Sequence, residues 1–163
     1  MKRLILVLIG CFLATGALAE TRGFQLSLTP DLAIHSKTTQ VEGATLGLWS
    51  ENPQNAFALG IVNGSTGSSS GLSLGFGNYA ENYKGAQLAL INYAKGEFRG
   101  LQWGAFNYAA KLHGLQFGFV NYAESSDKGV QIGFINIMNQ TKNWFSGLPD
   151  ELTPAMVFVN WRL

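Results

Sequence analysis

Cysteine and histidine are almost missing from this chain, which has one of the first and two of the second in 163 residues. The only thiol, Cys11, lies in the N-terminal segment, so no disulfide can form within one chain and no thiol chemistry is expected. His35 and His113 are far apart in the sequence, and neither has a second ligand at metal-binding spacing. We therefore expect no metal centre, no cofactor and no catalytic residue.

Charge and long apolar runs are also scarce. Only 13% of the residues are charged, and 11 basic side chains stand against 10 acidic ones. A nucleic-acid partner needs a basic stripe, which is missing here. No apolar run reaches the length of ~20 residues that a membrane-spanning helix requires. Apolar residues recur with a spacing of two, which is typical of strands.

The first 19 residues read as a targeting segment. Lys2 and Arg3 precede an apolar run over 4–13, and Ala17 and Ala19 form a small-x-small cleavage site. We expect a signal peptide over 1–19 and a mature chain with nine basic and ten acidic side chains, a net charge of −1. The alternative is lipidation at Cys11. Either reading predicts export across the inner membrane to the periplasm, the cell surface or the outer membrane.

A short motif recurs every 13–15 residues between 43 and 138. The clearest copies are GLSLGFGNYA, GAQLALINYA, GLQWGAFNYA, GLQFGFVNYA and GVQIGFINIM. We number each copy from its first residue, which is Gly43, Ala56, Gly71, Gly85, Gly100, Gly114 or Gly129. One unit this short cannot bury its own apolar side, so the copies must stack.

The repeats divide the chain into four parts. After the signal peptide, we expect an N-terminal strand and cap over 20–42, and then the repeat domain over 43–138. A loop and a capping strand follow over 139–163, with the strand over 156–163. Within the repeats, GSTGSSS at 64–70 reads as a connecting loop.

Two all-β architectures could use this repeat. One is a short-coil β-solenoid, a two-sided roll of about seven repeats, and the other is a small up-and-down outer-membrane barrel. Spacings that change between odd and even would flip the buried side in an antiparallel meander, whereas parallel coils tolerate them. Position 8 is Asn in six copies, which suits a ladder that bonds the backbone at a fixed corner. We therefore predict the solenoid, with a ladder formed by Asn63, Asn78, Asn92, Asn107, Asn121 and Asn136.

The apolar residues at positions 2, 4 and 6 are expected to face the core. Position 3 and position 9 would then face outward, together with the apolar position 7. This outer stripe reads either as a structural column of like residues or as a flat binding face for a glycan, a protein or the outer-membrane surface. Its candidate residues are Gln87, Gln102, Gln116, Gln131, Tyr79, Tyr93, Tyr108 and Tyr122.

Two weaker signals point to chemistry. GSSSG at 67–71 matches the nucleophile pattern GxSxG around Ser69, which would make the protein a hydrolase. That chemistry requires a strand–turn–helix, and no helix pattern follows, so a flexible connector is the competing interpretation. Acidic residues in the connecting segments could converge as a cation site or simply keep the surface soluble; these are Glu81, Glu97, Glu124 and Asp127.

The GLQxGxxNYA copies resemble a family of bacterial secreted surface-repeat proteins with tandem GLQxGxxN units. The resemblance covers 56–138 and extends more loosely to the last strand. It implies residence at the cell surface or in the periplasm and transfers no catalytic residue. The expected function is a non-enzymatic structural or binding protein, with an outer-membrane barrel protein and a hydrolase as the alternatives.

Overall fold

The computed structural model describes residues 20–139 and 155–162. The expected signal peptide over 1–19 and most of the loop after the repeats lie outside these ranges. The described residues form strands and no helix. The strands are β1 (Thr21–Thr29), β2 (Leu32–Ala33), β3 (Gln40–Leu74), β4 (Gly77–Leu88), β5 (Ile91–Trp103), β6 (Phe106–Met138) and β7 (Ala155–Arg162).

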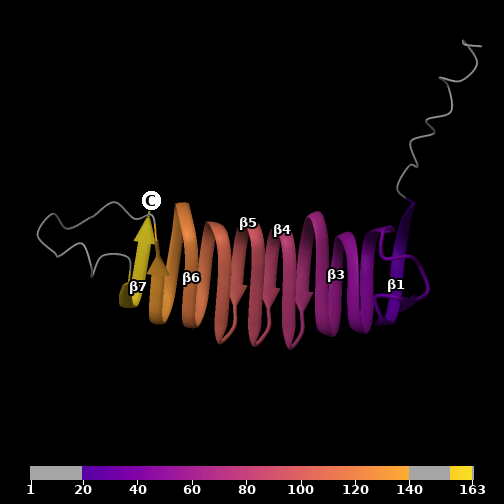
Figure 1. The fold of residues 1–163 in the computed structure, drawn as a ribbon, viewed down its shortest axis with the longest axis horizontal. Helices are drawn as coiled ribbons and strands as arrows, with labels where there is room; N and C mark the ends of the chain where they lie inside the picture. The colour runs from indigo at the N-terminus through magenta and orange to yellow at the C-terminus, as the bar shows by residue number, and fades with distance from the viewer. Residues whose placement is uncertain (1–19, 140–154, 163) are drawn as a thin grey trace, which may run out of the picture.

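The repeats stack as parallel coils in a β-solenoid of about six turns (Figure 1). The strand order is β2-β1-β3-β4-β5-β6-β7, and β1, β3, β4, β5 and β6 pair in parallel. Equivalent positions lie beside one another: Asn78 pairs with Asn63 on one side and with Asn92 on the other. The solenoid prediction is confirmed, and the alternative of an up-and-down barrel is wrong because neighbouring copies run in the same direction.

The N-terminal end of the repeat domain is built differently from the expected cap, whereas the C-terminal end is closed by a strand as expected. β1 enters the stack as a coil of its own, since Phe24 pairs with Ala44 and Gln25 with Thr45 in parallel. The short β2 then pairs antiparallel with the outer edge of β1. At the other end, β7 pairs antiparallel with the last part of β6 and closes it, which agrees with the capping strand predicted over 156–163.

Each coil turns a corner at positions 5 and 6. The strands break at residues 75–76, 89–90 and 104–105, and these breaks follow one long edge of the solenoid, the lower edge in Figure 1. Positions 3 and 8 both point inward although an odd number of steps separates them, so the alternation of sides restarts at the corner. As a result, the expectation that positions 2, 4 and 6 face the core is wrong: they face outward.

The interior holds two columns of amides in place of those apolar residues. The expected Asn ladder is confirmed: Asn92 Nδ2 donates to Asn107 Oδ1 at 2.9 Å, and Asn107 Nδ2 donates to Asn121 Oδ1 at 2.8 Å. Each also donates to the position 4 carbonyl of the next coil, as Asn92 does to Trp103 O at 3.0 Å. These carbonyls lie at the corner and also accept from the backbone, as Trp103 O does from Ala89 N at 3.0 Å, so the Asn side chains supply a second donor that ties the column to the corner.

The glutamines form the second column, and it runs the other way. Gln116 Nε2 donates to Gln102 Oε1 at 2.7 Å, and Gln102 Nε2 donates to Gln87 Oε1 at 3.1 Å, toward the N-terminus. Gln102 also donates to the carbonyl of Tyr108 on its own coil at 3.1 Å. Both columns are therefore bound to the backbone as well as to themselves, which fixes the orientation of each amide.

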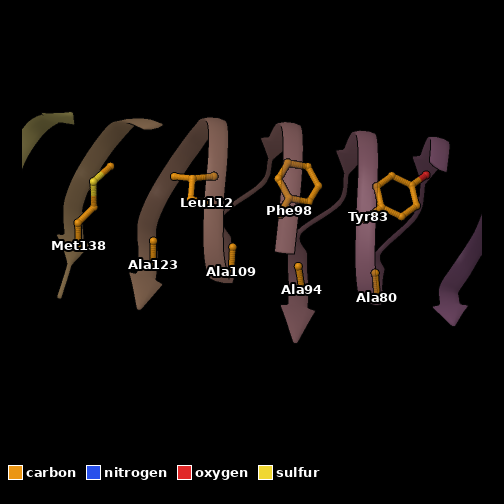
Figure 2. Close-up of a cluster of buried hydrophobic side chains, with 8 residues drawn as sticks. All are labelled: Ala80, Tyr83, Ala94, Phe98, Ala109, Leu112, Ala123 and Met138. Atoms are coloured by element: carbon orange, nitrogen blue, oxygen red, sulfur yellow. The ribbon is translucent and has the colours of Figure 1, made fainter. Parts of the chain in front are cut away.

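A small apolar core fills the rest of the interior (Figure 2). Alanines at position 10 form one row, and larger side chains from the segment before the next glycine form a second row facing them. Tyr83 and Phe98 stack in this second row with ring centroids 6.2 Å apart. The repeat motif ends before this segment, so the burial of these residues was not predicted. The cluster consists of Ala80, Tyr83, Ala94, Phe98, Ala109, Leu112, Ala123 and Met138.

The segment 64–70 is part of a strand and was wrongly expected to be a loop. It lies within β3, where Ser68 and Ser69 pair with Asn82 and Tyr83. Ser65 and Ser69 are buried, and the hydroxyl of Ser69 donates to Thr66 O at 2.7 Å. Small hydroxyl residues here fill interior positions that larger residues occupy in later coils.

Candidate binding surface

The outer surface of the coils is apolar over half of each turn. No charged residue stands at positions 2–8 of any of the seven copies. The most exposed side chains belong to position 6, on the corner, where Phe119 is 67% and Phe134 is 61% exposed. We call positions 2–7 of the seven copies the apolar surface. Its exposed aromatic residues include Trp49, Phe57, Phe76, Trp103, Phe106, Phe117, Phe119 and Phe134.

A groove runs along the corner between two rows of these side chains. Its floor is made by position 5, where glycine or alanine leaves room, and its walls by positions 4 and 6. Gly104 and Gly118 cannot carry a Cβ here, because it would collide with the carbonyl of the preceding coil. The hollow has a volume of about 740 Å³ and is lined by Leu88, Ala89, Leu90, Trp103, Gly104, Ala105, Phe117, Gly118, Phe119 and Phe134.

A row of tyrosines at position 9 borders the apolar surface on one flank. Tyr93 and Tyr108 stack with centroids 4.7 Å apart, and Tyr108 and Tyr122 stack at 5.5 Å. Tyr79 stands outside this stack and bonds to Glu51. The predicted outward placement of these four tyrosines is confirmed, since they are exposed or half-buried.

Two phenols of this row, those of Tyr79 and Tyr108, have a raised pKa. Burial, followed by the hydrogen bond to Glu51, raises the pKa of Tyr79 to about 12. The hydrogen bond to Glu124 raises the pKa of Tyr108 to about 12. Both hydroxyls therefore stay protonated at neutral pH. This flank presents aromatic rings that end in hydrogen-bonding groups.

The other flank of the apolar surface is basic. The last residue of four successive copies is Lys84, Arg99, His113 or Lys128. The two lysines and the arginine are exposed, and His113 is half-buried. Ion pairs involve two neighbouring acids: Glu97 accepts from Arg99 at 3.0 Å, and Asp127 lies 2.7 Å from Lys111. The hydrogen bond between Lys111 and Asp127 lowers the pKa of the carboxyl and raises that of the amine.

The glutamines do not belong to any binding face. Gln87, Gln102, Gln116 and Gln131 are 0% exposed, so their predicted outward placement is wrong. The reason is the restart of the alternation at the corner, which places position 3 on the inside. An odd spacing between two polar columns, positions 3 and 8, with a small residue between them at position 5, was the signal in the sequence that could have revealed this.

Of the candidates for chemistry, Glu97 and Asp127 are brought together beside His113, whose Nδ1 lies 4.0 Å from Glu97 Oε1 and 3.9 Å from Asp127 Oδ2. Ser69 donates to a backbone carbonyl and accepts from Gln54 N at 3.0 Å, so its hydroxyl is engaged in holding the coil. The four acidic residues divide between the two flanks: Glu81 accepts from Gly67 N at 2.7 Å, and Glu124 from Tyr108. Within residues 20–139 and 155–162, no group of three or more His, Cys, Asp or Glu could hold a metal ion.

In the described part of the chain, no helix has the length and the apolar character needed to cross a bilayer. Comparison of the chain with protein-family models, with curated proteins and with solved structures gives no match.

Proposed function

We propose that this protein is a non-enzymatic, exported repeat protein that binds its partner through the apolar surface. The observation that supports this proposal most is that polar side chains fill the interior while large apolar side chains face the solvent, the reverse of the usual arrangement. Amides fill the interior, whereas Trp103, Phe119 and Phe134 are more than half exposed. Contiguous apolar patches of this kind mark interaction sites on soluble proteins.

The interior of each coil is filled without the apolar surface. The amide columns, the alanine row and the short apolar cluster occupy it. Side chains at position 6 keep much of their apolar area in water, although Phe134 also packs edge-on against Phe158 of β7, and that exposure costs free energy. A chain that needed only to fold would be more soluble with polar residues there, so these residues support a role in binding.

The resemblance to secreted surface-repeat proteins is consistent with this role, and so is the predicted signal peptide. Both stay predictions, and they place the proposed partner outside the cytoplasm, at the cell surface, in the periplasm or at the outer membrane. A regular array of equivalent side chains offers a partner the same contact once per coil, which suits an extended ligand.

Photo-crosslinking tests the proposal. The full chain is expressed in an exporting bacterial host with benzoylphenylalanine at Phe119, and as a matched control at Lys111 on the charged side. We expect adducts from position 119, to protein or to lipid, and far fewer from position 111. Equal labelling at the two positions, or none at either, would refute a binding role for the apolar surface.

A serine-reactive phosphonate tests the hydrolase alternative on the same protein. We expect no labelling, because Ser69 is buried and donates to Thr66 O. Labelling that disappears in Ser69→Ala would establish the enzyme instead.

A further inference from the structure

The apolar surface is large enough to be a binding site. The seven copies are separated by six spacings of ~4.8 Å and so extend roughly 29 Å, and five residue steps across positions 2–7 span about 17 Å. The product, roughly 490 Å², lies in the upper half of the range for the largest patch on an ordinary monomer, and such patches are often functional. The patch is also unbroken by charge along its whole length.

We propose that a lipid bilayer surface is the cover, and that the solenoid lies on it with its corner edge inserted. This inference rests on the proposed function and names the partner of the same surface. The inserted edge is the lower edge of the solenoid in Figure 1, where the strands break at positions 5 and 6. Its deepest side chains are those of position 6, including Phe76, Phe119 and Phe134.

The order of side chains across a coil matches the order of environments across half a bilayer. Aromatic and aliphatic residues of positions 4, 6 and 7 stand at the corner. The tyrosine row follows on one flank, with the rings of Tyr93 and Tyr108 stacked and the Tyr108 hydroxyl bound to Glu124. Amphipathic rings of this type concentrate at the level of the headgroups. Charged residues come only beyond these positions, on the side that would face water.

The basic flank supplies charge complementarity to anionic headgroups. Lys84 and Lys128 have no ion-pair partner among the residues that the structure describes, and Arg99 stands between them in the same column. Basic groups beside an inserted apolar edge are attracted to lipid phosphates. Anionic lipid should therefore strengthen binding through this column of basic residues. The apolar edge should account for the binding to lipid without net charge.

The shape of the edge favours a bilayer over a second copy of the chain. The apolar residues wrap around a corner, so the surface that they form is convex across the coil axis apart from the groove along position 5. Two convex edges meet along a narrow line and leave positions 2 and 7 uncovered. A fluid lipid surface adapts to the corner and covers both sides of it, which accounts for apolar residues on both strands that flank the corner.

Vesicle flotation tests the inference with the purified mature chain. The vesicles are phosphatidylcholine alone, and phosphatidylcholine mixed with phosphatidylglycerol. We expect binding to both, stronger to the mixture, with a blue shift of tryptophan emission that Trp103→Phe reduces. The double variant Phe119→Ser/Phe134→Ser should lose at least roughly tenfold in vesicle partition, because two large apolar side chains no longer insert.

Two further variants separate charge from insertion. Lys84→Gln/Lys128→Gln should lose the preference for the anionic mixture, roughly fivefold for each lysine, and keep its binding to phosphatidylcholine. Lys37→Ser/Asp31→Ser, which removes an ion pair before the repeats and leaves the net charge unchanged, is the matched control and should bind as the parent does. Circular dichroism confirms that every variant keeps its strands.

Three results would overturn the inference. One is a parent chain that does not float with either vesicle. The second is flotation that the Phe119→Ser/Phe134→Ser variant retains in full. The third is a dimer in sedimentation equilibrium that the same variant dissociates, which would identify a second copy as the cover. If crosslinks from position 119 persist while flotation fails, the binding role stands and only the bilayer is refuted; if both fail, the proposed function falls with it.

Discussion

The stability of the coils should depend on where along the Asn column a residue is removed. Asn107 lies inside the column, where Nδ2 donates to Asn121 Oδ1 and to Phe117 O and Oδ1 accepts from Asn92. Asn63 begins the column, and its Oδ1 is one of the buried atoms without a partner in the described residues. The two asparagines are equivalent in sequence and unequal in bonding.

The loss can be counted atom by atom. Asn107→Ala removes four hydrogen bonds, of which the one to Gly104 O is long at 3.4 Å, and leaves Asn121 Oδ1 without a donor. Phe117 O keeps its bond from Gly104 N at 3.0 Å. At about 1 kcal/mol for each bond, and somewhat more for the orphaned oxygen, the free energy of unfolding should fall by about 3–4 kcal/mol.

Asn63→Ala removes two hydrogen bonds, one to the backbone carbonyl of Leu74 and one to Asn78 Oδ1. Asn78 Oδ1 still accepts from Ser73 Oγ at 2.8 Å. This variant should therefore cost about 1–2 kcal/mol. The exposed Asn55, which accepts one bond from Ser70, provides the control, and its replacement by alanine should cost less than about 0.5 kcal/mol.

Urea denaturation, followed by far-ultraviolet circular dichroism, measures the free energy of unfolding of the three variants. Equal slopes of the transitions show that the variants expose the same surface on unfolding. The predicted order of loss is Asn107 first, Asn63 second and Asn55 last. Equal losses at Asn107 and Asn55 would show that the amide column contributes nothing. Equal losses at Asn107 and Asn63 would show that the bonds do not add along it.

Two other substitutions test the interior. Ser50 stands at position 8 one coil before Asn63, is buried, and has a hydroxyl without a partner in the described residues. Ser50→Asn should therefore extend the Asn column and raise the free energy of unfolding by about 1–2 kcal/mol, measured in the same urea transition. Burial raises the pKa of Tyr83, so its contribution to stability is complete below the ordinary tyrosine value of about 10 and is lost as the pH rises above it. Tyr83→Phe should therefore melt at a temperature no lower than the parent at pH 7 and decline less on going to alkaline pH; a lower melting temperature at both would contradict this reading.

The solenoid could be predicted from the sequence because the repeats have the same pattern in every copy. Copies that keep their pattern while their spacing alternates between odd and even can only be matched in a parallel stack, and the pairing of Asn78 with Asn92 follows from that. The ladder followed as well, since identical amides in register can bond each other. Neither inference required knowledge of which side of the strand faced inward.

The prediction of which side chains face inward was wrong because it rested on hydrophobicity alone. Leu101, Gln102 and Trp103 alternate as any half-buried strand would, and burial of the apolar pair is the ordinary outcome. In this narrow coil, buried amides bond to each other along the axis and add a second donor to corner carbonyls such as Trp103 O, and an aliphatic side chain can do neither. The candidate surface was consequently placed on the correct side for the tyrosines and on the wrong side for the glutamines.

The opposed directions of the two amide columns bear on how long such a protein can grow. Asparagine side chains orient their dipoles one way along the axis and glutamine side chains the other, so their fields largely cancel, and a longer array accumulates no macroscopic polarity. The unpaired atoms sit at the column termini, at Asn63, Gln87 and Gln131 among the described residues. Their penalty is fixed, whereas each inserted copy brings a full complement of bonds. Duplication or deletion of whole copies should therefore be tolerated, and the number of copies can act as an adjustable ruler during evolution.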